Sequence, residues 1–277
     1  MKVLTWNTAC ARGTSAAVAL ADRIGADVVL LQEAQPTSLW TGPLVGAAVP
    51  SRPWGSWVMV RTGVLQEIAI ANYSGWVTGA RWRRNDAGGT TYVFSIHSPT
   101  PNENERRGSY VAEAVKIVAA ICEQVPSSGR LVIGGDFNFK SLGERLASEQ
   151  IRTDNAELRA LQEFRKRGLS IAWRDVHPQR ALPQTLRWRS APTTPFHCDG
   201  FLTRGLTTAA MACDIICSDG ETRVSDHNPV VLQLPMNPAA QHACAAAGGR
   251  GDEEPRRRKR RRAARVRMSL DGTNSQD

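Results

Sequence analysis

The residues from Leu131 to Asn138, LVIGGDFN, limit the architecture of this chain more than any other stretch. Branched apolar residues predict a buried strand, two glycines allow a sharp turn at its end, and a carboxylate and an amide follow at alternate positions. With the two-residue period of a strand, Asp136 and Asn138 would point the same way from the edge of a sheet. Asp and Asn are also common turn formers, so this stretch alone leaves a structural explanation open.

Several other apolar runs also end in a polar residue. Val3 to Asn7, 27–33 and 92–97 predict strands that end at Asn7, Glu33 and His97. Segments in which apolar residues have helical spacing lie between some of these runs. Helices are therefore expected at 14–24, around 110–121 and from about residue 155. Between 42 and 89 strands are expected at 57–61, 65–71 and 76–83, and a turn leads from the last of them into the strand at 90–97. Because these strands follow one another directly, antiparallel pairing is predicted.

The 277 residues, 42% of them hydrophobic, predict one large domain over 1–236 and a disordered basic tail over 237–277. The tail holds 10 Arg and Lys and 5 Asp and Glu, so it supplies +5 of the net charge of +9 and leaves +4 for the rest. Its arginine run, 256–262, suits counterion release from nucleic acid or an anionic membrane. A solvated extension without a specific partner fits the composition equally well.

The expected location is cytoplasmic, without integral membrane association. Met1 and Lys2 lead directly into a strand-like segment, and neither a signal peptide nor a membrane span is visible. The six cysteines form no paired framework, so we expect reduced, mostly structural thiols.

Polar side chains at the predicted strand ends form a set. Because strand ends converge in space, these side chains could line one pocket. Asp199 stands among apolar neighbours and therefore needs a partner. Carboxylates, histidines and amides are the groups that metal-assisted attack of water on a phosphate ester requires. The set consists of Asn7, Glu33, His97, Asp136, Asn138, Asp199, Asp226 and His227.

In its order of motifs the chain resembles the endonuclease/exonuclease/phosphatase superfamily, which includes deoxyribonuclease I-like nucleases. The resemblance spans residues 1 to about 235 and implies a four-layer αββα sandwich, two packed mixed β-sheets flanked by helices. The matching motifs are Thr5-Trp6-Asn7, Leu31-Gln32-Glu33, Ser95-Ile96-His97, Gly135-Asp136-Phe137-Asn138, Cys198-Asp199-Gly200-Phe201 and Ser225-Asp226-His227-Asn228-Pro229-Val230.

The same resemblance implies a role for each residue. Glu33, helped by Asn7 and with Asp226 nearby, would hold a divalent ion, Mg²⁺ or alternatively Mn²⁺. His227, oriented by Asp199, would act on the attacking water or stabilise the phosphate.

Three further residues would act on the water and the phosphate. Asp136 is the other candidate for handling water, Asn138 would bind a phosphoryl oxygen, and His97 would hydrogen-bond the phosphate. Deoxyribonuclease-like members pair the first catalytic histidine with an early Glu, whereas 54–57 here contains no acid, so His97 is expected to be less basic or paired elsewhere.

Basic residues mixed with an aromatic residue bear on the substrate. Arg81, Arg83 and Arg84 surround Trp82, and basic residues mixed with aromatics suit a nucleic-acid backbone and its bases. A hairpin with one buried face explains the same pattern. We therefore expect a phosphodiesterase acting on nucleic acid, with hydrolysis of a phospholipid or small phosphorylated metabolite as the alternative. A binding protein without catalysis is a weaker alternative, and the oligomeric state is open.

Overall fold

The structure is a computed structural model of the chain, and it describes residues 1–85, 89–99, 109–149, 151–207, 209, 211–217 and 221–235. The expected tail, 237–277, lies outside these residues.

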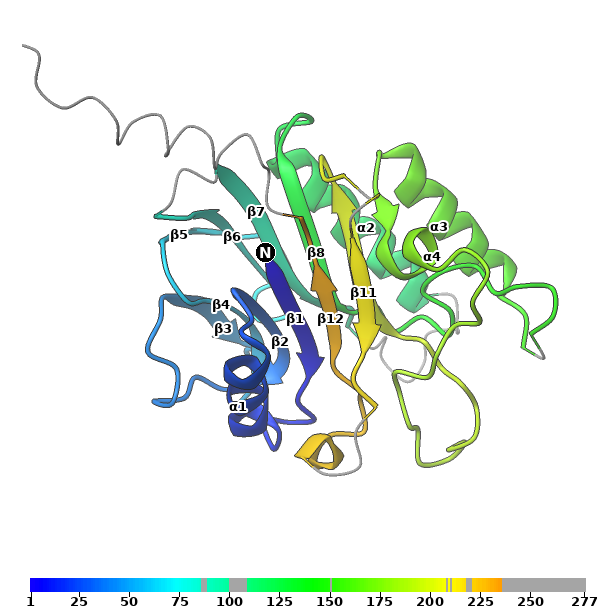
Figure 1. Cartoon of the computed structure of the whole chain (residues 1–277), viewed down its shortest axis with the longest axis horizontal. Helices are drawn as coiled ribbons and strands as arrows, with labels where there is room; N and C mark the ends of the chain where they lie inside the picture. Colours follow the sequence, from blue (N-terminus) through cyan, green and yellow to red (C-terminus); the bar gives the residue numbers. More distant parts are fainter. Residues whose placement is uncertain are drawn as a thin grey trace, which may run out of the picture.

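Two mixed six-stranded sheets packed face to face form the centre of the molecule (Figure 1). Sheet A has the strand order β11-β12-β1-β2-β4-β3, and only β1 and β2 are parallel in it. Its strands are β1 (Lys2–Asn7), β2 (Val28–Ala34), β3 (Leu44–Ala48), β4 (Gly55–Val60), β11 (Ala212–Ile215) and β12 (Val230–Gln233).

Sheet B has the order β5-β6-β7-β8-β10-β9, and its parallel pair is β7 with β8. The strand predicted at 90–97 is confirmed as β7. Sheet B consists of β5 (Val64–Ile68), β6 (Val77–Arg83), β7 (Thr90–His97), β8 (Arg130–Asp136), β9 (Ser170–Ile171) and β10 (Asp199–Arg204).

Helices cover the outer faces of both sheets (Figure 1). Helix α1 lies against sheet A and ends at Gly25, whose left-handed backbone closes the helix. The outer face of sheet B carries α2 and α3, whereas the short helix α4 packs against β10 and β11 at the edge of the core between the sheets. The bounds are α1 Thr14–Ile24, α2 Ser109–Gln124, α3 Asn155–Lys166, α4 Ala172–Val176 and the 3-10 helix η2 Glu221–Val224.

Three apolar clusters correspond to the three interfaces between the four layers. Trp6 and Leu20 belong to the cluster between α1 and sheet A, while Phe201 and Trp82 belong to the one between the sheets. The third joins sheet B to α2 and α3 and includes Phe94. Burying side chains of this size contributes about 1.5–3 kcal/mol each. The αββα sandwich predicted from the sequence is therefore confirmed.

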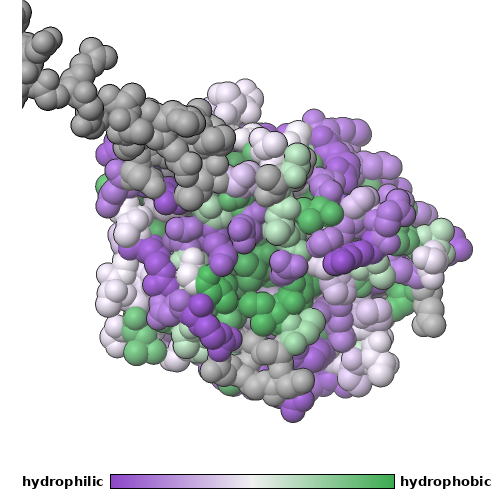
Figure 2. All heavy atoms as spheres, viewed as in Figure 1, coloured by the Kyte–Doolittle hydropathy of each residue, from purple (hydrophilic) through white to green (hydrophobic). Residues whose placement is uncertain are grey.

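Helix α1 covers only part of the outer face of sheet A. Figure 2 shows apolar residues gathered over β1 and β12, in the middle of a face that is otherwise largely hydrophilic. No helix in the described ranges is both long and apolar enough to cross a membrane.

The two glycines before Asp136 serve packing rather than a turn. Both lie inside β8. A Cβ on Gly135, whose φ is +153°, would lie 1.9 Å from the carbonyl oxygen of Ile96. One on Gly134 would lie 2.6 Å from the ring of Phe201. The expected sharp turn is thus wrong, because the strand continues to Asp136 and needs glycine where β7 and the inter-sheet core approach it.

Candidate active site

Three neighbouring strands of sheet B place a histidine and two aspartates in one row. His97 ends β7 and pairs in register with Asp136, the last residue of β8, which pairs with Asp199, the first residue of β10. Residues opposite one another on neighbouring strands point to the same face. All three side chains are buried, with exposed fractions of 6%, 2% and 1%. The topology therefore brings together residues separated by about a hundred positions.

His227 completes this row from the loop that enters β12 in sheet A. The indole nitrogen of Trp6 donates to the carbonyl oxygen of His227 (3.0 Å), and the His227 N–H donates to Ser225 Oγ (3.0 Å). Ser225 Oγ in turn donates to the carbonyl oxygen of Asn7 (2.7 Å). His227 is thus attached to the end of β1 on two sides.

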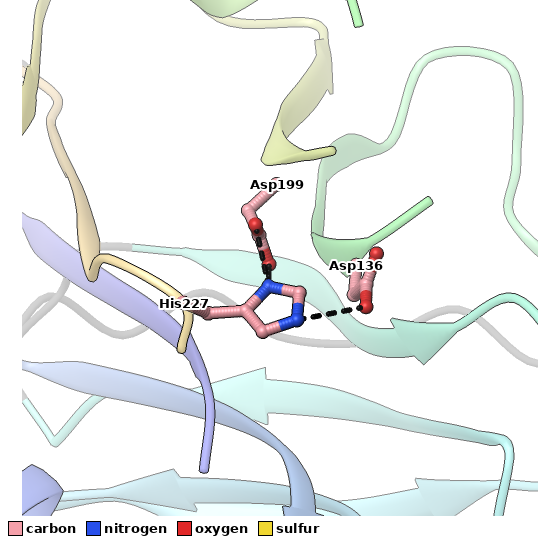
Figure 3. A group of neighbouring side chains, drawn as sticks. All are labelled: Asp136, Asp199 and His227. Atoms are coloured by element: carbon pink, nitrogen blue, oxygen red, sulfur yellow. Dashed lines mark hydrogen bonds and ion pairs between the residues drawn. The ribbon is translucent and has the colours of Figure 1, made fainter. Parts of the chain in front are cut away.

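The imidazole of His227 lies between the two aspartates (Figure 3). Its Nδ1 is 2.8 Å from Asp199 Oδ2, a hydrogen bond, whereas its Nε2 is 3.8 Å from Asp136 Oδ2. The second distance exceeds a hydrogen bond, so Nε2 is available to a ligand. Asp199 therefore has the partner that its burial required, and it orients the ring as expected.

Burial and charge act against each other on this trio. Burial alone would lower the pKa of His227, but Asp199, Asp136 and Asp226 outweigh it and raise that pKa to about 10. Burial and the charge of Asp199 raise the pKa of Asp136, although both histidines oppose this. The carboxylates of Asp136 and Asp199 thus lie close together in a buried site, and positive charge nearby stabilises their ionised forms.

Glu33 reaches the site through an irregularity in β2. The pairing with β4 shifts register between Leu31 and Ala34, and Glu33 has a left-handed φ of +49°. Such a bulge redirects a side chain at a cost of about 1–3 kcal/mol. Glu33 Oε2 accepts hydrogen bonds from the backbone N–H (2.8 Å) and thiol (3.1 Å) of Cys10. Burial would raise the pKa of Glu33, but His97, Cys10 and Asn7 hold it below its ordinary value.

Asn7 joins the carboxylates of the two sheets. Its Nδ2 donates to Asp136 Oδ2 (3.1 Å) and lies 3.4 Å from Glu33 Oε1. Its Oδ1 accepts the N–H of Ala9 (3.1 Å). A role as a metal ligand would use Oδ1, so it requires the amide to turn over.

His97 is held between two tryptophan rings rather than by an acid. The ring centroids of Trp54 and Trp76 lie 5.8 Å and 5.2 Å from that of His97. His97 Nδ1 is buried and has no hydrogen-bond partner among the residues that the structure describes. Its Nε2 lies 3.8 Å from both Glu33 Oε1 and Asp136 Oδ2. Burial lowers the pKa of His97 despite these carboxylates, as the missing acid at 54–57 predicts.

Asn138 and Asp226 lie at the margin of this cluster. Asn138 has a left-handed φ of +55°, its Nδ2 donates to the carbonyl oxygen of Ser98 (2.6 Å), and its N–H donates to Asp136 Oδ1 (2.9 Å). It therefore fixes Asp136 as well as offering its second amide hydrogen. The carboxylate of Asp226 is half-buried beside His227 and forms no hydrogen bond or ion pair within the described ranges.

The three arginines proposed to bind substrate lie at the other end of sheet B. Arg83 pairs with Thr90, at the start of β7, whereas His97 ends that strand. Seven residues of strand separate them by roughly 23 Å. Trp82 between them is buried, and Arg84 lies 3.7 Å from Asp27 and over the Trp82 ring. The structure therefore does not bring Arg81, Arg83 and Arg84 to the catalytic cluster. The alternation of buried and exposed residues at the end of β6 accounts for the pattern at 81–83.

Two supporting residues were not predicted from the sequence. Thr185 Oγ1 accepts the N–H groups of Cys198 (2.8 Å) and Asp199 (3.1 Å), and Gln32 Nε2 donates to Ser95 Oγ (2.9 Å) across the two sheets. Both side chains are fully buried. Gln32 lies within a recognised motif, whereas nothing near Thr185 in the sequence marks it.

The donor set fits a divalent cation. Asp136, Asp199 and His227 each offer an atom within 4.8 Å of the others. Asn7 Nδ2 brings the carboxylates of Asp136 and Glu33 to the same place. Carboxylate oxygens are the ligands that hard divalent cations prefer, and a cation would offset both the burial and the charge of Asp199 that raise the pKa of Asp136.

Comparison with known proteins identifies the family of this chain. Residues 4–227 match the Endonuclease/Exonuclease/phosphatase family, and the chain belongs to it. This is a superfamily of divalent-metal-dependent phosphoesterases. No curated protein matched the chain.

Solved structures of low sequence identity share the fold. The 3′ phosphatase NExo from Neisseria, bound to product DNA hairpin, is 18% identical with a TM-score of 0.63, covering 85% of this chain and 99% of its own. An AP endonuclease from Archaeoglobus fulgidus is 13% identical with a TM-score of 0.62, covering 84% and 99%. The endonuclease domain of TRAS1, a telomere-specific non-LTR retrotransposon, is 15% identical with a TM-score of 0.59, covering 85% and 98%.

Proposed function

We propose that this protein is a Mg²⁺-dependent phosphodiesterase that hydrolyses the backbone of nucleic acid, with Mn²⁺ as an alternative ion. The observation that carries the proposal is the row of His97, Asp136 and Asp199 facing His227, next to Glu33. Positive charge near the row supports an anionic polymer as substrate. Arg52 lies close enough to His97 to lower its pKa, and its guanidinium stacks over Trp54.

Each side chain has a task in this proposal. Glu33 and Asp136, whose carboxylates Asn7 Nδ2 joins, would hold the divalent ion, and the bound ion would supply charge stabilisation and a more acidic water. His97 donates from Nε2 to a phosphoryl oxygen, since its Nδ1 is buried against Trp54 and Trp76. His227, whose ring Asp199 orients, presents Nε2 to the phosphate or the attacking water. Asn138 contributes its remaining amide hydrogen.

A substrate panel tests this function directly. Purified protein with Mg²⁺ or Mn²⁺ is incubated with plasmid, single-stranded DNA, RNA, sphingomyelin and a series of phosphomonoesters. We expect cleavage of at least one nucleic acid, abolished by EDTA. Release from lipid or from monoesters alone would contradict the nuclease proposal and favour the phospholipid or small-metabolite alternative.

Glu33 is expected to control metal affinity. At an ion concentration of about 100 times Kd, binding stabilises a protein by about 2.7 kcal/mol, which for a chain of this size corresponds to a rise in Tm of roughly 5–10 °C. Glu33→Gln removes a charged oxygen ligand, so most of this rise should disappear in thermal unfolding with and without Mg²⁺. Glu67→Gln, on the exposed edge strand β5, is the matched control and should keep the full rise. An unchanged rise in Glu33→Gln would remove Glu33 from the metal site.

A further inference from the structure

The tripeptide Arg-Trp-Arg occurs twice in the sequence, and the structure gives the two copies opposite environments. Trp82, in the copy at 81–83, is 2% exposed and belongs to the core between the sheets. Trp188, in the copy at 187–189, is 51% exposed. All eight tryptophans lie in the described part of the chain, and the other seven are buried or half-buried. Trp188 is therefore the tryptophan that the fold leaves facing solvent.

The segment before Trp188 is fastened to the catalytic residues. Leu186 forms β-bridges with both His227 and Phe196, and the N–H of Arg187 donates to the carbonyl oxygen of Asp226 (2.8 Å). The Arg187 guanidinium donates to Asn228 Oδ1 and to the carbonyl oxygen of Ser225. Arg187 is thus a structural residue, and the chain position of Trp188 is tied to that of His227.

This attachment limits how far Trp188 can be from the chemistry. Cα atoms paired in a bridge lie about 5 Å apart, and two further residues add at most about 7 Å. The Cα atom of Trp188 is therefore within about 12 Å of that of His227. A nucleic-acid strand whose phosphate is bound at His227 can reach a side chain at this distance.

Phe196 supports the indole of Trp188 from one side. Their ring centroids are 5.9 Å apart with the planes at 66°, an edge-to-face contact. Arg189 and Ser190, which follow, are exposed. Trp188 is thus supported by a second ring, precedes an exposed arginine and lies close to His227. Aromatic rings next to basic residues bind single-stranded nucleic acid by stacking and charge.

We propose that Trp188 is a stacking platform for a nucleobase adjacent to the scissile phosphate, with Arg189 near the backbone phosphate of the same strand. The proposal rests on the proposed function and narrows its substrate to strands in which that base is free to stack. A single exposed indole packed on Phe196, with an arginine beside it, matches a nucleotide better than a lipid surface, for which a wider apolar area would be needed.

Kinetics on oligonucleotides that each lack one base test the platform. Loss of base stacking by alanine substitution is expected to raise KM about 5- to 150-fold for Trp188→Ala, with kcat little changed. Trp188→Phe, which keeps a ring, should recover most of the affinity. In the wild-type protein, removing the stacked base should give the same loss as Trp188→Ala, and combining the two should add nothing.

The controls separate stacking from loop damage. Val64→Ala changes another exposed apolar side chain, 53% exposed at the far end of sheet B, and should leave KM unchanged. Losses that add for every base position, or an equal loss on an oligomer without bases, would overturn the platform. Binding of anionic lipid vesicles that depends on Trp188, with unchanged oligonucleotide KM, would overturn it as well.

The failure of the platform can be told apart from failure of the proposed function. Wild-type protein that cleaves nucleic acid while Trp188→Ala cleaves it with the same KM contradicts only the platform. Wild-type protein that cleaves no nucleic acid contradicts the proposed function. In that case fluorescence anisotropy of a labelled oligonucleotide in EDTA still compares the two proteins, and equal affinities overturn the platform.

Discussion

Replacing His227 with alanine is expected to lower kcat/KM by about 10²- to 10⁴-fold, the range for loss of a positioned acid, base or charged group. His227 Nε2 lies next to Asp136, and the hydrogen bond from Nδ1 to Asp199 fixes the ring. The variant leaves Asp199 buried without its partner, so part of the change could come from the fold. His227→Gln keeps a hydrogen-bonding group there, and circular dichroism with thermal unfolding shows whether each variant is folded.

The pH dependence of kcat/KM distinguishes two roles for His227. Because the pKa of His227 is raised to about 10, the ring is protonated at neutral pH, which favours charge stabilisation or proton donation over proton abstraction. Activity should therefore fall as pH rises through that pKa, and a bound cation would move the fall to lower pH. This descending limb should be absent in His227→Gln. His177 forms a hydrogen bond with the carbonyl oxygen of Cys213, away from the site, so His177→Ala should keep both the activity and the descending limb.

The regular parts of the fold follow from local patterns in the sequence. Apolar runs with a period of two or near 3.6 predicted β7 and α3 because each buries a continuous face. The short strands β9 and β11 were not predicted, since two and four residues carry no readable period. Their pairing depends on β10 and β12, which lie beside them only once the chain has folded.

The candidate site was predicted as a set of residue types but not as a geometry. Strand ends were enough to select His97, Asp136 and Asp199, because pairing register converts chain position into proximity. Sequence could not distinguish the two Arg-Trp-Arg tripeptides, since their exposure depends on which elements pack over them. The pattern at 81–83 attracted the prediction, but it is the copy at 187–189 that lies beside the site.

Asp136→Asn is expected to change activity and stability in opposite directions. The two side chains have the same shape, but the amide oxygen can accept only one of the two hydrogen bonds, because Asn7 Nδ2 donates to Oδ2 and the N–H of Asn138 donates to Oδ1. What disappears is the negative charge between His97 and His227. If that charge holds the cation or handles the attacking water, kcat/KM should fall at least about 10²-fold.

The stability change follows from the direction of the pKa shift. An aspartate whose pKa is raised in the folded protein binds its proton more tightly there than in the unfolded chain. Its contribution therefore turns against folding as pH rises above the unfolded value of 3.8. Without metal, and at a pH above its raised folded pKa, ionised Asp136 costs stability, and Asp136→Asn removes that cost. Its Tm in EDTA should rise by about 2–4 °C for each kcal/mol relieved.

Added Mg²⁺ should reverse the order of the two proteins. The bound cation offsets the repulsion between the wild-type carboxylates, so the Tm of the wild-type protein rises more than that of Asp136→Asn. Asp214→Asn, on the exposed side of β11, is the matched control and should alter neither Tm nor activity appreciably. A lower Tm for Asp136→Asn in EDTA would show that His97 and His227 already compensate the buried charge, which would leave the site less dependent on a cation than its crowded carboxylates indicate.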